Sequence, residues 1–225
     1  MFSLYPMDKK TKKVAIIVAH PDDETLWAGG TILDNPVWDC FIACLCRKND
    51  PDRAPKFNRV LKILGAKGNM GDLDDGPEQK PLAENEVEDA IIQLLPATNF
   101  DLIITHSING EYTRHRRHEE IGEAVINLWH SGKLTTDELW AFSYEDGNRE
   151  YYPRPIKNAH IGHLISAQLW GMKYNIITSI YGFDKNSWEA KTTPTEEAFW
   201  HFNSADQAYK WLVTGSKNYE STIII

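Results

Sequence analysis

Histidine and carboxylate side chains follow directly on a short apolar segment near the N-terminus. Residues 14–19 read VAIIVA, and the next five residues are His20, Pro21, Asp22, Asp23 and Glu24. Charged groups gathered in this way cost folding energy unless a ligand or a partner offsets that cost. A second cluster stands much later in the chain, where His115 and His118 are separated by two residues.

Imidazoles and carboxylates from these two clusters could hold a divalent transition metal. Catalytic zinc takes about three protein ligands and keeps one position for water, and manganese or iron are substitutes for the same kind of donor set. His20 and Asp23 are three residues apart across an expected strand-to-helix turn, which can aim both side chains at one point. One carboxylate and one imidazole then remain without a metal contact, and a hydrolase needs such groups beside its metal.

Apolar segments with strand and helix periodicity alternate along the first two thirds of the chain. Buried strands are expected at residues 14–19, 39–47, 102–105 and 139–145. Helices are expected after Asp22 or Asp23, around 57–64, after a cap at Asn85, around 121–129, and over 158–174. The alternation predicts an α/β fold, a Rossmann-like three-layer sandwich with a mostly parallel sheet. Ligands bind beyond the carboxyl ends of strands in such sheets, so both clusters are expected on the same rim.

Length and composition suit a single globular domain of residues 1–225. We expect a regular α/β core at about 13–147 and a less regular C-terminal third. A net charge of −8 disfavours nucleic acid and anionic membranes as default partners, and no apolar run approaches the roughly 20 residues of a membrane span. The N-terminus lacks the early basic region of a signal peptide. The oligomeric state stays open, a homo-oligomer included.

Three cysteines lie on one strand-like segment, at Cys40, Cys44 and Cys46. Such a set cannot form a disulfide framework, and alternation along one strand favours a buried apolar face over a metal site. We therefore expect a reducing, cytoplasmic compartment.

The stretches AHPDDE (19–24) and AGGTIL (28–33) resemble the signature of the PIG-L/LmbE-like zinc deacetylases, which remove acetyl groups from N-acetylglucosamine-containing substrates. The resemblance covers residues 14 to about 130 and includes the helix ending in LGA (64–66). It implies that His20, Asp23 and His118 hold Zn2+, that Asp22 is the general base, and that His115 stabilises the developing charge or protonates the leaving amine. The function expected on this basis is removal of an acetyl group from a small N-acetylated sugar conjugate.

The chain departs from the family pattern between its paired histidines, where Arg116 and Arg117 replace the commoner Pro-Asp. This change is expected to put two cations beside the site, and Tyr112 is matched to the family's loop tyrosine. Glu24 either supports a metal ligand or points into solvent. His106 ends a strand near the site and either takes part in the site or satisfies backbone groups in its loop, and we do not assign it to the site.

Residues of the C-terminal third are expected to be structural. His160 and His163 are placed on one side of the expected helix, and packing is the default for the aromatic residues Trp170, Trp188, Trp200 and Trp211. Two other functions remain open. One is a metal amidohydrolase acting on an amide that is not on a sugar, and the other is a non-catalytic sugar- or metal-binding protein with the same fold.

Overall fold

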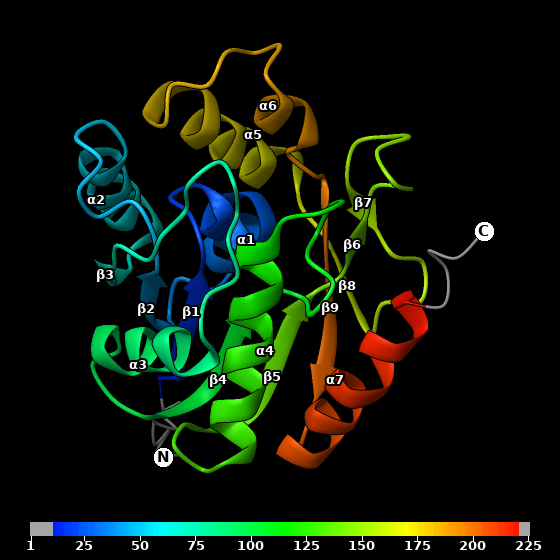
Figure 1. Cartoon of the computed structure of the whole chain (residues 1–225). Coiled ribbons are helices and arrows are strands. Elements are labelled where there is room, and N and C mark those ends of the chain that lie inside the picture. The colour runs from blue at the N-terminus through cyan, green and yellow to red at the C-terminus, as the bar shows by residue number, and fades with distance from the viewer. Residues whose placement is uncertain (1–10, 221–225) are drawn as a thin grey trace, which may run out of the picture.

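A seven-stranded sheet forms the centre of the molecule (Figure 1). The computed structural model describes residues 11–220, with side chains described to residue 215. Five strands run parallel in the order β3-β2-β1-β4-β5, and β9 and β8 continue the sheet in antiparallel pairings. The strands are β1 Lys13–Val18, β2 Asp39–Cys44, β3 Lys67–Met70, β4 Asn99–Thr105, β5 Thr135–Phe142, β8 Ile161–Leu164 and β9 Glu196–Phe202.

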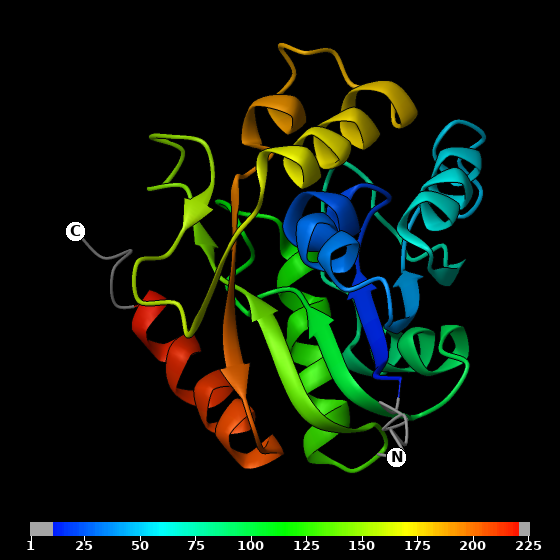
Figure 2. The same ribbon diagram turned by 180° about the vertical axis from the view of Figure 1, so that it is seen from behind.

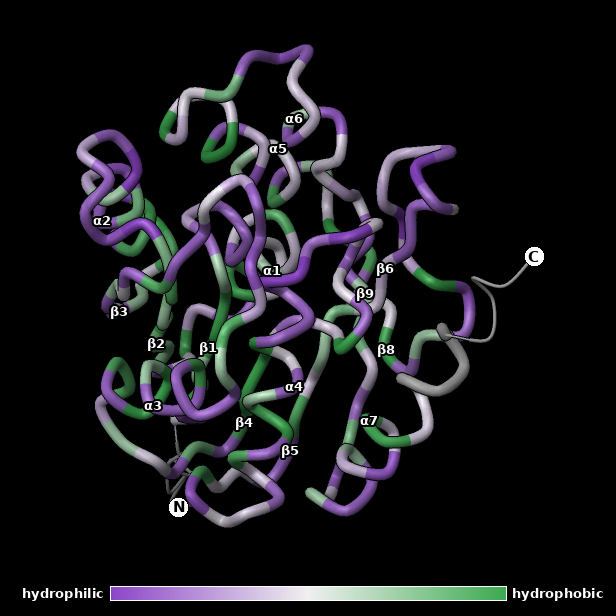
Figure 3. Tube along the Cα trace, viewed as in Figure 1, coloured by the Kyte–Doolittle hydropathy of each residue, from purple (hydrophilic) through white to green (hydrophobic). Residues whose placement is uncertain are grey.

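Helices cover both faces of this sheet, which gives the predicted three layers (Figures 1 and 2). One face carries α1 Asp23–Asp34, α2 Arg53–Leu64 and the π-helix η1 Ile176–Ile180, and α5 Ala167–Asn175 packs against α1 and η1. The other face carries α3 Glu84–Leu94, α4 Arg116–His130 and α7 Ala205–Glu220. Both faces of β1 are fully buried, with Ile16 in one core and Ile17 in the other. Figure 3 shows the resulting apolar interior strands beneath more polar connections. The α/β prediction is confirmed.

The chain leaves the sheet toward opposite faces after two neighbouring strands. β1 pairs with β4, yet α1 packs on one face and α4 on the other. A crevice therefore opens beyond the carboxyl ends of β1 and β4, which is the usual ligand position in open α/β sheets. Among residues 11–220, no helix has the length and apolarity needed to cross a membrane.

Two predicted helix boundaries were wrong. No helix spans 158–174, because residues 161–164 pair with β9 as strand β8, and α5 begins only after the Ser166 hydroxyl caps it by accepting from Leu169 N. The apolar spacing in that segment is helical, but pairing with β9 overrides it and leaves Leu164 76% exposed, so His160 and His163 do not share a helix face. α3 begins at Glu84 with Ala83 at its N-cap, and Asn85 lies inside the helix.

A buried ion pair ties α1 to the C-terminal third. The Glu197 carboxylate on β9 accepts from the backbone N–H groups of Gly30 and Thr31, each at 2.7 Å, and from Lys173 Nζ at 2.7 Å. A Cβ at Gly30 would lie 2.4 Å from Ile165 Cδ1, so only glycine permits this close approach of α1. The contacts hold the helix whose first turn carries the acidic cluster.

Candidate metal centre and active site

Strand register brings the two polar clusters together. Ile17 of β1 lies opposite Thr105 of β4, so the residues that follow both strands become neighbours. The backbone N–H of Ala19 donates to His106 Nε2 at 3.0 Å, which links the two strand ends directly. His20 then stands over the crevice, and α4 brings His118 to it in its first turn.

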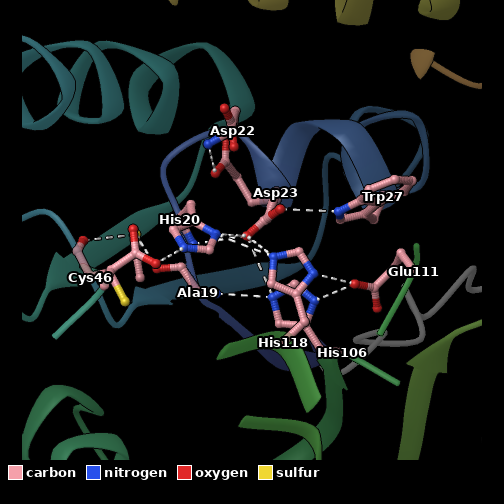
Figure 4. Close-up of polar contacts among 12 residues, drawn as sticks. Ala19, His20, Asp22, Asp23, Trp27, Cys46, His106, Glu111 and His118 are labelled. Atoms are coloured by element: carbon pink, nitrogen blue, oxygen red, sulfur yellow. Dashed lines mark hydrogen bonds and ion pairs between the residues drawn. The ribbon is translucent and has the colours of Figure 1, made fainter. Parts of the chain in front are cut away.

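The three residues that the resemblance offers as metal ligands converge on one point (Figure 4). His20 Nδ1 lies 3.1 Å from Asp23 Oδ2 and 3.2 Å from His118 Nε2, and the last two atoms are 3.3 Å apart. Ligands about 2.0–2.2 Å from a tetrahedral zinc ion are separated by about 3.3 Å, so the three atoms have the spacing such an ion requires. The described donor set therefore fits zinc.

Asp23 is held in its ionised form at the centre of this cluster. The carboxylate accepts from His20 N at 2.8 Å and from Trp27 Nε1 at 3.1 Å, and it is almost fully buried. Burial alone would raise the pKa of Asp23. Without a metal ion, positive charge on His118 and the close contacts of Asp23 with the His106, His118 and His20 rings outweigh burial and hold that pKa well below its usual range. An ionised carboxylate is the form that binds a metal.

Glu111 determines which nitrogen of His118 faces the cluster. Its Oε2 lies 2.5 Å from His118 Nδ1 and 2.9 Å from His106 Nδ1, and its Oε1 accepts from Ser107 N at 3.0 Å. A carboxylate accepts only, so both imidazoles carry hydrogen on Nδ1 and the His118 Nε2 lone pair is left for a metal. Burial would raise the pKa of Glu111, yet the two imidazoles lower it to about 2.

His106, which the sequence left unassigned, belongs to the centre. Its Nε2 accepts from Ala19 and its Nδ1 donates to Glu111, so both ring nitrogens are occupied. The ring also stacks on His118 with centroids 3.9 Å apart. His106 is therefore a supporting residue rather than a ligand. A histidine at a strand end followed five residues later by a glutamate was the signal available in the sequence.

The other nitrogen of His20 lies against an acidic residue from the connection between β3 and α3. His20 Nε2 is 3.1 Å from Asp75 Oδ1, and Arg47 donates to Asp75 Oδ2 from Nη2 at 2.6 Å and from Nε at 2.9 Å. Burial would raise the pKa of Asp75, but hydrogen bonding and charge from His20 lower it strongly. Nothing in the spacing of the aspartates between residues 72 and 75 distinguishes this one from its neighbours.

Asp22 lies beside the cluster and faces the cavity. It is the N-cap of α1 with a φ of 127°, a conformation that costs energy in a residue other than glycine. Its Oδ2 accepts from Arg53 Nη1 at 3.3 Å. Burial and the nearby Asp23 charge raise the pKa of Asp22 well above its usual value. A carboxylate with a raised pKa is suited to accepting and returning a proton.

Glu24 supports Asp22 and does not point into solvent. This fully buried carboxylate accepts from Asp22 N at 3.1 Å, from Thr25 Oγ1 at 2.6 Å and from Tyr181 Oη at 2.8 Å. Burial raises the pKa of Glu24 to about 7, and these hydrogen bonds oppose the rise. Three donors thus hold the segment in which Asp22 adopts its strained backbone.

His115 completes the set of imidazoles around the crevice. It caps the N-terminus of α4, and its ring centroid lies 4.7 Å from that of His20 and 4.3 Å from that of His118. Its buried Nδ1 has no hydrogen-bond partner among the described residues. Burial, with the charges of His118 and His20, lowers the pKa of His115 to about 2, so the ring is neutral at pH 7.

Two further donor sets overlap the first. Ring nitrogens of His115, His20 and His118 lie within 4.8 Å of one another, and so do donor atoms of Asp23, His106 and His118. Both ring nitrogens of His106 already form hydrogen bonds, so the set of Asp23, His106 and His118 offers two metal ligands and not three. His115 is the alternative fourth donor.

A cavity of about 350 Å³ opens over these groups. Its walls combine acidic, basic and aromatic side chains from six segments of the chain: His20, Pro21, Asp22, Asp23, Leu26, Arg47, Arg53, Asp75, Tyr112, His115, Trp188 and Glu189. Trp188 thus lines the cavity, although packing was its expected role.

The two arginines between the paired histidines do not lie where we expected them. Arg117 is fully buried, donates to the Lys80 carbonyl at 3.1 Å and contacts Glu120, while Arg116 is exposed. Neither lines the cavity. Its cations come instead from the region after β2, as Arg47 and Arg53.

All three cysteines are buried as predicted, but β2 ends at Cys44 and Cys46 lies just beyond it. Cys40 and Cys44 lie in the core on the α1 side, and all three thiols are free. Burial raises the pKa of Cys40 to about 12 and raises those of Cys44 and Cys46 as well, which leaves them as unreactive thiols at neutral pH.

Solved structures with a similar fold include enzymes of more than one kind. The N,N'-diacetylchitobiose deacetylase of Pyrococcus horikoshii is 16% identical, with a TM-score of 0.61 over 87% of this chain and 85% of that one. The 4-carboxy-2-hydroxymuconate hydratase GalB of Pseudomonas putida is 18% identical, with a TM-score of 0.57 over 81% and 83%. The zinc-inhibited form of teicoplanin deacetylase Orf2 is 14% identical, with a TM-score of 0.57 over 86% and 99%.

The sequence itself matches one protein family over half of its length. Residues 15–129 fit the family model described as PIG-L, GlcNAc-PI de-N-acetylase. That segment contains every residue placed around the candidate metal point, from His20 through His118. The chain therefore belongs to the PIG-L family of de-N-acetylases.

Proposed function

We propose that this protein is a zinc-dependent hydrolase that removes an acetyl group from an N-acetylglucosamine-containing substrate. The observation that carries the proposal is the convergence of His20 Nδ1, Asp23 Oδ2 and His118 Nε2 at separations of 3.1–3.3 Å. The Asp22 carboxylate and the His115 imidazole line the same cavity and are not needed as metal ligands. Family membership supports the same reaction.

Each group at the site has a role that its surroundings favour. Zinc held by the three atoms would polarise the acetamide carbonyl and lower the pKa of a water molecule to about 7. The Asp22 carboxylate would accept a proton from the attacking water, since its raised pKa favours holding that proton before it passes to the departing amine.

Developing negative charge on the carbonyl oxygen is met by His115 and by two helix ends. As a neutral imidazole, His115 donates an N–H hydrogen bond rather than acting as a cation. The N-termini of α1 and α4 both lie at the crevice, at Asp22 and His115, and their dipoles favour an anion there.

The cavity has the size and lining for one acetamido sugar. Its volume of about 350 Å³ lies at the small end of the range for small-molecule sites. Arg47, Arg53, Asp75 and Glu189 offer hydrogen bonds for hydroxyl groups, and Trp188 offers an aromatic wall.

Two other functions are compatible with the site, one with a different substrate and one without catalysis. A metal amidohydrolase would cleave amides that are not on a sugar, and a binding protein would take up ligand without turnover. Because fold alone does not determine the reaction, the choice depends on the chemistry of the site. A base placed beside three metal donors favours hydrolysis over binding.

The remaining expectations belong to the same proposal. We propose that the chain acts as a single domain on a small-molecule substrate without nucleic acid. Three free buried thiols are consistent with a reducing, cytoplasmic compartment.

The experiment is a panel assay on zinc-loaded protein. N-acetylglucosamine, its methyl glycoside, its phosphodiester conjugates and non-sugar acetamides are each incubated with the protein, and free amine and acetate are measured. We expect equal amounts of both products from sugar acetamides and none from the others. Turnover restricted to non-sugar amides supports the amidohydrolase, and zinc binding without turnover on any amide supports the binding protein.

An Asp22→Asn variant tests the assigned base. Turnover should fall by about 10²- to 10⁴-fold while zinc content stays at the wild-type level. Asp206→Asn is the matched control, because this aspartate on α7 has a 93% exposed side chain and lines none of the cavities described. Wild-type turnover in Asp22→Asn would remove the base assignment.

A further inference from the structure

A second and larger cavity adjoins the candidate active site. Its volume is about 590 Å³, and it shares Tyr112 and Trp188 with the first cavity. The two rings contact each other edge to face, with centroids 4.7 Å apart. A ligand extending past these rings from one cavity therefore enters the other.

The second cavity is built mainly from segments outside the family match. Thr113 and Arg114, from the loop before α4, also line it. The other walls come from the loop between β6 Tyr144–Glu145 and β7 Arg154–Pro155, and Trp188 opens α6 Trp188–Thr192. Both views show this hairpin and α6 rising at the end of the sheet where β1 and β4 finish (Figures 1 and 2). The family match ends at residue 129. The candidate metal ligands thus lie within the matched part, and most of the residues that line this cavity lie outside it.

Aromatic rings dominate the lining, and its charges cancel. Four of the nine lining residues are aromatic, and Tyr152 is 46% exposed. Arg114 and Arg149 are balanced by Asp146 and Glu150. A balanced set gives no net attraction for a phosphate or a carboxylate. It suits a neutral ring that is apolar on its faces and carries hydroxyl groups at its edge, as a sugar ring does.

The hairpin loop is held in place before any ligand arrives. Asp146 accepts from Thr113 N at 2.9 Å and from Thr113 Oγ1 at 2.7 Å, and Arg149 Nε donates to the Thr113 carbonyl at 2.6 Å. Gly147, Asn148 and Arg149 have φ values of 58°, 58° and 72°. Positive φ is unfavourable for Asn148 and Arg149, which are not glycine, so the surrounding contacts must stabilise this backbone conformation. A preorganised wall loses little entropy on binding.

We infer that this cavity is a subsite for a second, neutral glycosyl residue, linked to the N-acetylated sugar that occupies the first cavity. The inference rests on the proposed function and narrows its substrate class to a disaccharide or a longer glycan. Tyr152 and Trp188 supply the stacking faces, and Arg149 and Glu150 lie where ring hydroxyl groups would meet them.

The test compares N,N'-diacetylchitobiose with methyl N-acetyl-β-glucosaminide as substrates of zinc-loaded protein. We expect kcat/KM to be about three- to tenfold higher for the disaccharide, which is the gain that one aromatic contact supplies. Tyr152→Ala should reduce this ratio to about one, whereas Tyr152→Phe should preserve it. Tyr209→Ala is the matched control, since Tyr209 is 38% exposed, stacks on His130 and lines neither cavity.

Binding measurements separate failure of the subsite from failure of the proposed function. Calorimetry on the zinc-loaded Asp22→Asn variant should show tighter binding of the disaccharide by a similar factor. If neither compound is hydrolysed but the disaccharide binds more tightly, the subsite stands and the proposed function fails. A wild-type ratio near one overturns the subsite whether or not the variants fold. A folded Tyr152→Ala protein with an unchanged ratio overturns it as well.

Discussion

Replacing Glu111 by glutamine should weaken zinc binding without removing any proposed ligand. The carboxylate accepts from His118 Nδ1, His106 Nδ1 and Ser107 N. In Glu111→Gln the amide nitrogen must face either Ser107 N or the two imidazoles, and it meets a donor in both cases. Either Ser107 N or the two imidazole N–H groups then lose their acceptor. His118 also loses the neighbouring negative charge that makes its Nε2 a stronger metal ligand.

The size of the effect follows from the contacts. Loss of a carboxylate that supports a metal-binding histidine typically costs 10- to 100-fold in metal affinity, and we expect about that loss. The lowering of the Glu111 pKa from 4.5 to about 2 corresponds to about 3 kcal/mol of folding free energy in the metal-free protein. Because the folded-state pKa is the lower one, this contribution is present above about pH 4.5 and disappears as the pH falls toward 2.

Two measurements check this reasoning. Chelator competition gives the zinc dissociation constant, and denaturant unfolding of metal-free protein between pH 2 and 7 gives the free energy of unfolding. The difference between wild type and Glu111→Gln should be largest at pH 7 and shrink as the pH falls. Glu138→Gln is the matched control, because Glu138 lies 3.1 Å from His201 at a partly exposed position on β5 and should change neither quantity by more than about 1 kcal/mol. A folded Glu111→Gln protein that binds zinc as tightly as wild type would refute the assignment.

Three further substitutions test other parts of the molecule. His118→Ala should lose bound zinc by elemental analysis, and wild-type zinc content would move the ligand elsewhere. Tyr181→Phe removes one of three donors to Glu24 and should lower the free energy of unfolding by about 1 kcal/mol, with an unchanged denaturant midpoint counting against the contact. Lys173→Met leaves the buried Glu197 carboxylate without its cation and should destabilise the protein by about 3–5 kcal/mol in thermal unfolding, whereas an unaltered Tm would show that the pair contributes little.

The parallel core and its rim could be predicted because their signals are local. A β-branched run such as residues 14–18 is buried on both faces wherever it occurs in a parallel sheet, and polar residues directly after it must lie at the rim. The segment at 158–174 could not be assigned in the same way. Its apolar residues have helical spacing, and pairing with β9, a contact distant in sequence, overrides that local preference.

Long-range contacts account for what the sequence analysis missed at the site. His106 and Glu111 gain their importance only when β4 is placed beside β1, and Asp75 only when its connection folds back over His20. The contact of Asp75 with His20 has no periodic pattern or fixed spacing, and the five-residue spacing of His106 and Glu111 does not by itself show that Glu111 also contacts His118. The histidines and aspartates of the two motifs were recognisable because metal binding requires ligands at short, fixed spacings in the sequence.

The burial of Arg117 changes how the motif itself should be compared between proteins. This side chain, from within the paired histidines, joins Glu120 of its own helix to the Lys80 carbonyl on the segment that precedes α3. The Glu120 carboxylate also accepts from Leu82 N at 3.1 Å, so both residues anchor one crossing of the chain. In a homologue with a shorter crossing, neither Arg117 nor Glu120 would make these contacts with the chain. Substitutions at the two positions should therefore occur together. Substrate charge should accordingly not be inferred from the residues between the histidines.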